Sequence, residues 1–73
     1  MSVAKVIEIT ADSPKSFDDA IHQAISRAAQ TIDHLEGAWV KDQEVLMHDG
    51  KISGYRVNLK ATFILDDKAR GMA

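Results

Sequence analysis

The sequence has no cysteine, a single proline and few aromatic residues among its 73 positions. The lack of cysteine excludes disulfide bonds, thiolate metal ligands and a cysteine nucleophile. A domain of this size buries only about 60% of the surface that its unfolded chain exposes, so it needs some additional source of stability. With disulfides excluded, oligomerisation is the supplement we expect.

Long apolar runs and an excess of one charge are also missing. Nothing approaches the roughly 18 consecutive apolar residues of a membrane span. The first ten residues already alternate and carry Lys5 and Glu8, which is not typical of a signal peptide. The nine basic residues are scattered among eleven acidic ones, and the net charge of −2 gives no basic stripe for nucleic acid. We therefore expect a cytoplasmic protein that binds neither membranes nor nucleic acid.

Signals for catalysis and for a metal site within one chain are absent too. The serines have no nucleophile-elbow context, and no glycine-rich loop follows a strand. His22, His34 and His48 stand too far apart in the sequence to suggest a shared metal ion, and the aspartates lack EF-hand spacing. The sequence thus predicts no catalytic and no metal-ligating residues, and hence no enzyme.

The clearest pattern present is the alternation in residues 55–65, which read YRVNLKATFIL. Every odd position from Tyr55 to Leu65 is apolar or aromatic, whereas Arg56, Asn58 and Lys60 occupy even positions. Such alternation predicts a strand with one packed face and one wet face. Another element must cover the odd face.

A helix from about Ser16 to about His34 is predicted to cover it. Ser16 is a suitable N-cap, Asp19 is its capping-box partner, and Gly37 is expected to follow the helix in left-handed geometry. The apolar residues recur every three or four positions and form one stripe. They are Phe17, Ala20, Ile21, Ala24, Ile25, Ala28, Ala29, Ile32 and Leu35. The row of alanines at 20, 24 and 28 would let the helix approach a sheet closely.

The remaining segments complete a β-α-β-β order. Residues 3–10 predict a first strand, 11–15 a connector and 38–47 a strand, and the Asp49-Gly50 pair at 48–51 favours a tight hairpin turn. We expect one α+β domain over residues 1–67 and a flexible C-terminal tail at 68–73. One helix leaves the other sheet face uncovered, with the even residues of 55–65 beside Trp39, Val45 and Met47 or their strand neighbours. This face predicts a homo-oligomer that also offers room for a ligand.

In order and spacing these segments resemble the dodecin family. The resemblance rests on VAKVIEIT, ADSPKSFDDAI, AISRAAQTIDHL, WVKDQ and YRVNLKATFIL, and it covers residues 3–67. It implies a β-α-β-β fold in which a three-stranded antiparallel sheet wraps one helix. It also implies a hollow homododecamer that stores or buffers flavins and is not a catalyst.

Carried over position by position, the resemblance implies five candidate flavin-binding residues, for FMN or riboflavin. The tryptophan that stacks on the flavin in the family falls at Gly37, and Trp39 stands two residues later, on the same strand face but about 7 Å further along. The family's hydrogen-bonding glutamine falls at Arg56, whose guanidinium donates but cannot accept. Asp42 and Gln43 match an Asp-Gln pair of the family.

Other roles are open for the same residues. Trp39 could serve as an interface anchor, and Arg56 could pair with Glu44 or Asp42 across the hairpin or between subunits. Two functions remain at this point. One is a flavin store; the alternative is a dodecameric shell without flavin that binds a divalent cation, as a calcium-type dodecin, or another small ligand. A calcium site would then have to be made between subunits.

Overall fold

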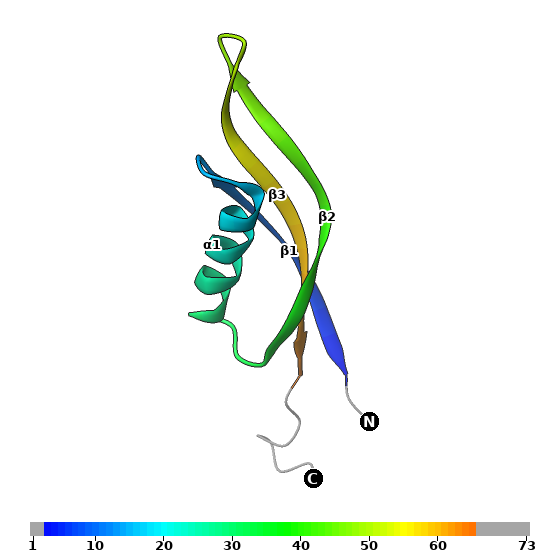
Figure 1. Cartoon of the computed structure of the whole chain (residues 1–73). Coiled ribbons are helices and arrows are strands. Elements are labelled where there is room, and N and C mark those ends of the chain that lie inside the picture. The colour runs from blue at the N-terminus through cyan, green and yellow to red at the C-terminus, as the bar shows by residue number, and fades with distance from the viewer. Residues whose placement is uncertain (1–2, 66–73) are drawn as a thin grey trace.

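A computed structural model describes residues 3–65 as one sheet and one helix. The elements are β1 (Ala4–Ser13), α1 (Phe17–Ala29), β2 (Leu35–His48) and β3 (Lys51–Ile64). The sheet order is β1-β3-β2 with both pairings antiparallel, so β3 is the central strand (Figure 1). The predicted β-α-β-β fold is confirmed. The tail predicted at 68–73, and residues 1–2 and 66–67 of the expected domain, lie outside the described part.

The core lies between α1 and the central strand. Val57, Leu59 and Ala61 of β3 are at most 1% exposed, as the alternation predicts. Ala20 and Ala24 of α1 pack against this strand. Because alanine side chains are short, the helix axis can approach the sheet closely enough to exclude water from the β3 side chains. Partly buried apolar residues at the rim complete the cluster: Ile9, Ala11, Phe17, Ile21 and Ile25.

The start of α1 follows the prediction in one of two respects. Ser16 is the N-cap, and its hydroxyl accepts a hydrogen bond from the Asp19 backbone N–H at 2.9 Å. The Asp19 side chain does not close a capping box. Instead its carboxylate accepts from the hydroxyl of buried Ser13 at 2.5 Å, which ties the end of β1 to the first turn of the helix.

The helix ends earlier than predicted. It stops at Ala29, and Gln30 is the C-cap, whose N–H bonds to carbonyls of the last turn. The Ile32 backbone N–H still donates to the Ala28 carbonyl at 2.9 Å. Ile32 therefore continues the spacing of apolar residues although α1 has ended. The β-branched Thr31 and Ile32 favour an extended chain over a further helical turn. The left-handed residue is His34 (φ 61), and Gly37 lies inside β2 opposite Thr62, so the predicted C-cap role of Gly37 is wrong.

All three strands are longer than predicted. Residues 11–13 of the connector expected at 11–15 belong to β1, because Asp12 and Ser13 still pair with β3. The hairpin turn is as predicted, with Asp49 (φ 51) and Gly50 (φ 76) both in the left-handed region that a type I′ turn requires. Val45 lies opposite Tyr55 and therefore on the α1 side of the sheet, not on the uncovered face.

Strand β2 is left largely uncovered by the helix. α1 packs against β1 and β3, and every β2 residue except Leu35 and Leu46 is exposed. Figure 1 shows the β2–β3 hairpin extending beyond the N-terminal end of α1. The radius of gyration is 15.4 Å, against about 11 Å for a compact domain of this length. The chain is thus too extended to bury its own apolar surface.

We expect Ala24→Leu to destabilise the fold by about 1–3 kcal/mol, because the added carbons would push α1 away from Val57 and Leu59. Urea unfolding at one fixed protein concentration measures the change. Ala29→Leu is the matched control, since Ala29 is an exposed residue of the same helix. Equal effects of the two substitutions would contradict the close approach of α1 to the sheet.

Candidate ligand-binding face of the sheet

The sheet surface turned away from α1 is here called the open face. Directly opposed residues of an antiparallel pair project to the same side, so the partners of the even-numbered β3 residues share this face. The register aligns them in three rows that cross β1, β3 and β2 in turn. The rows are Asp12–Arg56–Glu44, Thr10–Asn58–Asp42 and Glu8–Lys60–Trp39.

Ion pairs hold the first row together. The Arg56 guanidinium donates from Nε and Nη2 to the two oxygens of Asp12, at 2.7 and 3.1 Å. Its Nη1 lies 3.7 Å from Glu44 Oε1 on the other neighbouring strand. The hydrogen bond from Arg56, helped by its charge, lowers the pKa of Asp12 below the ordinary 3.8. The same bond raises the pKa of Arg56, so both groups stay charged.

A chain of hydrogen bonds forms the second row. Thr10 Oγ1 donates to Asn58 Oδ1 at 2.8 Å, and Asn58 Nδ2 donates to Asp42 Oδ1. The amide of Asn58 therefore links a hydroxyl on β1 to a carboxylate on β2. Asp42, which the sequence offered as a partner of Arg56, pairs with Asn58 instead, and only the Glu44 alternative is confirmed.

Trp39 is the large aromatic side chain of the third row. It lies opposite Lys60 and is 51% exposed. Gly37 lies opposite Thr62, so positions 37 and 39 share the open face, as predicted for residues two apart. Beside Trp39, the Lys41 amine lies 3.6 Å from Glu8, which joins β2 to β1 across the sheet.

The structure brings four of the five predicted site residues to the open face and leaves one out. Gly37, Trp39, Asp42 and Arg56 share it, whereas Gln43 lies opposite Val57 and projects to the α1 side. The cause is an irregularity between Val40 and Asp42, where one β2 residue has no partner on β3. A bulge of this kind changes which residues alternate together. Strict alternation would place Trp39 and Asp42, three residues apart, on opposite faces of the sheet. The bulge places them on the same face.

Sequence reasoning missed three residues of the face: Asp12, Thr10 and Asn58. Asp12 was assigned to a connector, so its place beside Arg56 was not visible. Asn58 was placed on the uncovered face but was not chosen as a site residue, and Thr10 was assigned to no face; the hydrogen bond between them depends on the register. The signal that could have found Asp12 is the requirement of a half-buried arginine for a carboxylate partner.

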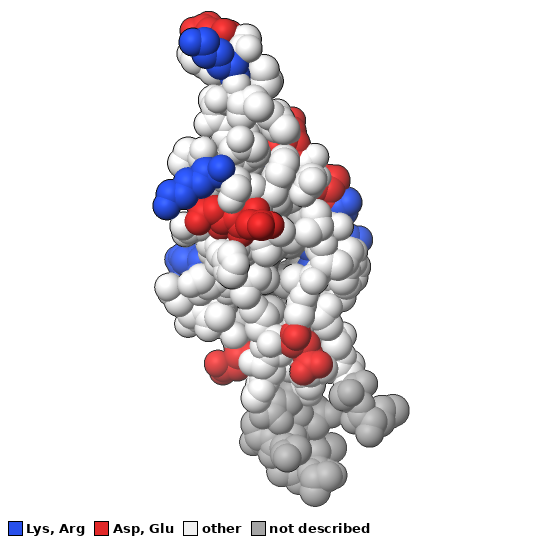
Figure 2. Space-filling model, viewed as in Figure 1, with Lys and Arg blue, Asp and Glu red and all other residues white. Residues whose placement is uncertain are grey.

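The first two rows border a polar depression of about 490 Å³. It is lined by Thr10, Ala11, Asp12, Glu44, Arg56 and Asn58. Carboxylates outnumber the cations on the open face, but each cation lies among them. The alternation of carboxylates and cations along the three rows makes the open face unsuited to a polyanion. Over the part of the molecule seen in Figure 2, which includes α1, acidic and basic side chains are likewise interspersed, with no large area of either sign.

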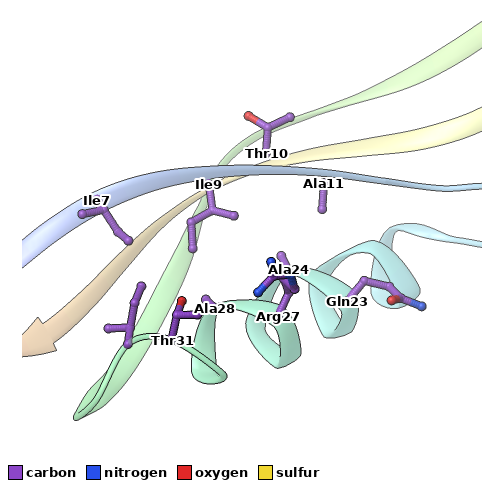
Figure 3. Close-up of a pocket in the computed structure, with 10 residues that line it drawn as sticks. Ile7, Ile9, Thr10, Ala11, Gln23, Ala24, Arg27, Ala28 and Thr31 are labelled. Atoms are coloured by element: carbon purple, nitrogen blue, oxygen red, sulfur yellow. The ribbon is translucent and has the colours of Figure 1, made fainter.

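A second hollow, of about 550 Å³, lies between α1 and the outer edge of β1. Figure 3 shows Ile7, Ile9 and Ala11 directed toward the helix, with Thr10 on the opposite side of the strand. The hollow is largely apolar and belongs to the free edge of the sheet. It is separated from the open face by β1 itself.

Two features are absent from the described residues 3–65. No helix there is long and apolar enough to cross a membrane. No three His, Asp or Glu side chains of this part gather closely enough to hold a metal ion.

The family model described as Dodecin matches residues 3–66. The chain belongs to the dodecin family. Dodecins are small binding proteins without enzymatic activity, so the sequence-based expectation of no enzyme is confirmed. The family assignment also accounts for the β-α-β-β fold described above.

Two relatives illustrate the match. The calcium dodecin of Mycobacterium tuberculosis is 39% identical over 64 residues, which cover 86% of this chain and 89% of that protein. The dodecin of Streptomyces davaonensis has a solved structure with a TM-score of 0.84 and 34% identity, covering 89% of this chain and 96% of that one. A crystal structure of the M. tuberculosis calcium dodecin, described as calcium chelating with a novel calcium-binding site, has a TM-score of 0.78 and 36% identity over 89% of this chain and 93% of that one.

We expect the contribution of Asp12 to stability to disappear in acid. Because the folded-state pKa lies below 3.8, the stabilisation is complete above that pH and is lost as the pH falls through the lower folded-state value. The difference in unfolding free energy between the wild type and Asp12→Asn should therefore be largest near neutral pH and should shrink below pH 3.8.

Chemical denaturation over a pH series, at constant protein concentration, measures this difference. Glu36→Gln is the charge control, because Glu36 forms no ion pair among the described residues and its removal changes the net charge equally. A difference for Asp12→Asn that is the same at every pH would contradict the ion pair with Arg56.

Proposed function

We propose that this chain forms a hollow homododecamer that stores or buffers a flavin, FMN or riboflavin, with the ring system stacked on Trp39. The observation that carries the proposal is the place of Trp39. A half-exposed indole lies on the open face, two β3 positions from a carboxylate that accepts hydrogen bonds. Planar heterocycles stack favourably on such a ring.

Assembly is supported by the surface that one chain leaves unburied. Eight large apolar side chains are at least 40% exposed: Val3, Val6, Trp39, Val40, Val45, Met47, Ile52 and Leu65. Half of them lie on β2, the strand that α1 does not cover. Both outer strands also present unpaired backbone edges, a liability that proteins cover or pair. A second copy of the chain meets both needs.

The polar groups around Trp39 support a flavin in part. Asp42 offers an acceptor for hydroxyl groups of the side chain of a flavin. Arg56 uses two of its five N–H groups on Asp12, so the others can reach a carbonyl or a phosphate. The bidentate pair with Asp12 nevertheless restricts Arg56, which weighs against a contact of the kind that a freely rotating glutamine would make.

A divalent cation is the second candidate ligand, supported by two observations. Four carboxylates, those of Glu8, Asp12, Asp42 and Glu44, lie on the open face, and oxygen ligands are what calcium prefers. A relative with 39% identity is named calcium dodecin. Since no described cluster within one chain can hold a metal, the ligands would come from more than one subunit.

We expect Trp39→Ala to weaken riboflavin and FMN binding by about tenfold, since stacking of a heterocycle on an aromatic ring contributes about 1–3 kcal/mol. Trp39→Phe, which keeps a smaller ring, should lose less. Quenching of flavin fluorescence on titration with cofactor-free protein measures the affinity. Absence of saturable quenching by the wild type would sink the flavin proposal, and calorimetric titration with CaCl₂ would then test the cation.

We expect the native particle to have a mass of about 96 kDa, twelve times the 8.0 kDa of one chain. Multi-angle light scattering on purified protein measures it. Trp39→Ala should keep this mass if the indole serves the ligand. Dissociation of that variant, with unchanged affinity in any remaining particle, would assign Trp39 to the subunit interface instead.

A further inference from the structure

We propose that Thr10 and Asn58 are positioning residues, which hold the Asp42 carboxylate in place for a hydroxyl group on the side chain of the bound ligand. The inference rests on the proposed flavin function and extends it to residues that do not themselves need to touch the ligand. It starts from the second row of the open face, where three side chains on three strands form one chain of hydrogen bonds.

The direction of this chain is set by chemistry. An amide has an acceptor oxygen and a donor nitrogen, and an ionised carboxylate can only accept. Asn58 must therefore turn Nδ2 toward Asp42, which leaves Oδ1 facing β1. Thr10 Oγ1 donates to that oxygen at 2.8 Å. The reverse orientation would place the amide oxygen against the Asp42 carboxylate, so the carboxylate selects this orientation of the Asn58 amide, and the Thr10 hydroxyl, which can donate or accept, acts as the donor to it.

The neighbouring row keeps Asp42 from being drawn elsewhere. Arg56 lies two residues before Asn58 on β3 and on the same face, and its positive charge would attract any free carboxylate nearby. Nε and Nη2 of Arg56 donate to the two oxygens of Asp12, and Nη1 lies toward Glu44. Asp42 therefore keeps Asn58 as its partner, and each row satisfies its own groups.

The result is a carboxylate with one oxygen engaged and one available. Oδ1 of Asp42 accepts from Asn58, and within residues 3–65 no protein group donates to Oδ2. Trp39 and Asp42 lie opposite Lys60 and Asn58, two residues apart on β3, so they are separated by about 7 Å along the strand. This spacing fits a ligand with a planar ring on Trp39 and a hydroxyl-bearing chain that extends toward Asp42.

Two flavins separate positioning from general stability. Riboflavin carries a polyhydroxy side chain, whereas lumiflavin has the same ring with a methyl group in its place. We expect Thr10→Val, which removes the hydroxyl and keeps the shape, to weaken riboflavin binding about fivefold and lumiflavin binding less than twofold. Thr10→Ser keeps the donor and should bind both as the wild type does. Asn58→Leu should behave as Thr10→Val does, with a larger loss for riboflavin.

The outcomes of fluorescence titration distinguish the two proposals. Equal losses of both ligands in Thr10→Val, or an unchanged affinity for riboflavin, would overturn the positioning role while leaving flavin binding intact. A wild type that binds neither flavin would overturn the proposed function and this inference with it. Light scattering on every variant confirms that the particle is intact. Thr10 is exposed, and valine suits a strand, so Thr10→Val should fold.

Discussion

The burial of alternate β3 side chains under α1 is the constraint on which the rest of the structure depends. Val57, Leu59 and Ala61 can be excluded from water only because the facing helix presents alanines. A shift of β3 by one residue would exchange them for Arg56, Asn58 and Lys60, whose burial beneath a helix would be costly. The register of the central strand is therefore strongly determined. Since both outer strands pair with β3, the same constraint aligns the three rows of the open face.

The small size of the helix decides what remains exposed. With 13 residues, α1 covers β1 and β3 but not the outer strand β2. The exposed β2 side chains include Trp39, Val40 and Val45, while Asp42 and Glu44 extend from the same strand. Exposed apolar side chains, which a partner subunit could cover, thus lie next to polar side chains that could bind a ligand. In a chain without cysteine, association is the available way to cover this surface.

The fold could be predicted from the sequence where one periodicity dominated. The alternation of 55–65, the helical stripe from Phe17 and the Asp49-Gly50 turn each predicted the correct element. The end of α1 could not be placed, because Ile32 continues the apolar spacing in a chain that has left the helix. The site was harder, since it depends on register. The β2 bulge sends Gln43 away from Asp42, and Asp12 reaches Arg56 only because β1 extends beyond its apolar part.

The two roles considered for Trp39 are compatible once binding and assembly are treated as linked equilibria. An indole that is 51% exposed in one chain has enough accessible surface to take part both in ligand binding and in a subunit contact, if both proposals hold. A ligand that binds only the assembled state stabilises that state by mass action, without any new contact between chains. If the proposed ligand and the proposed partner subunit both contact β2, ligand binding and subunit assembly would each favour the other.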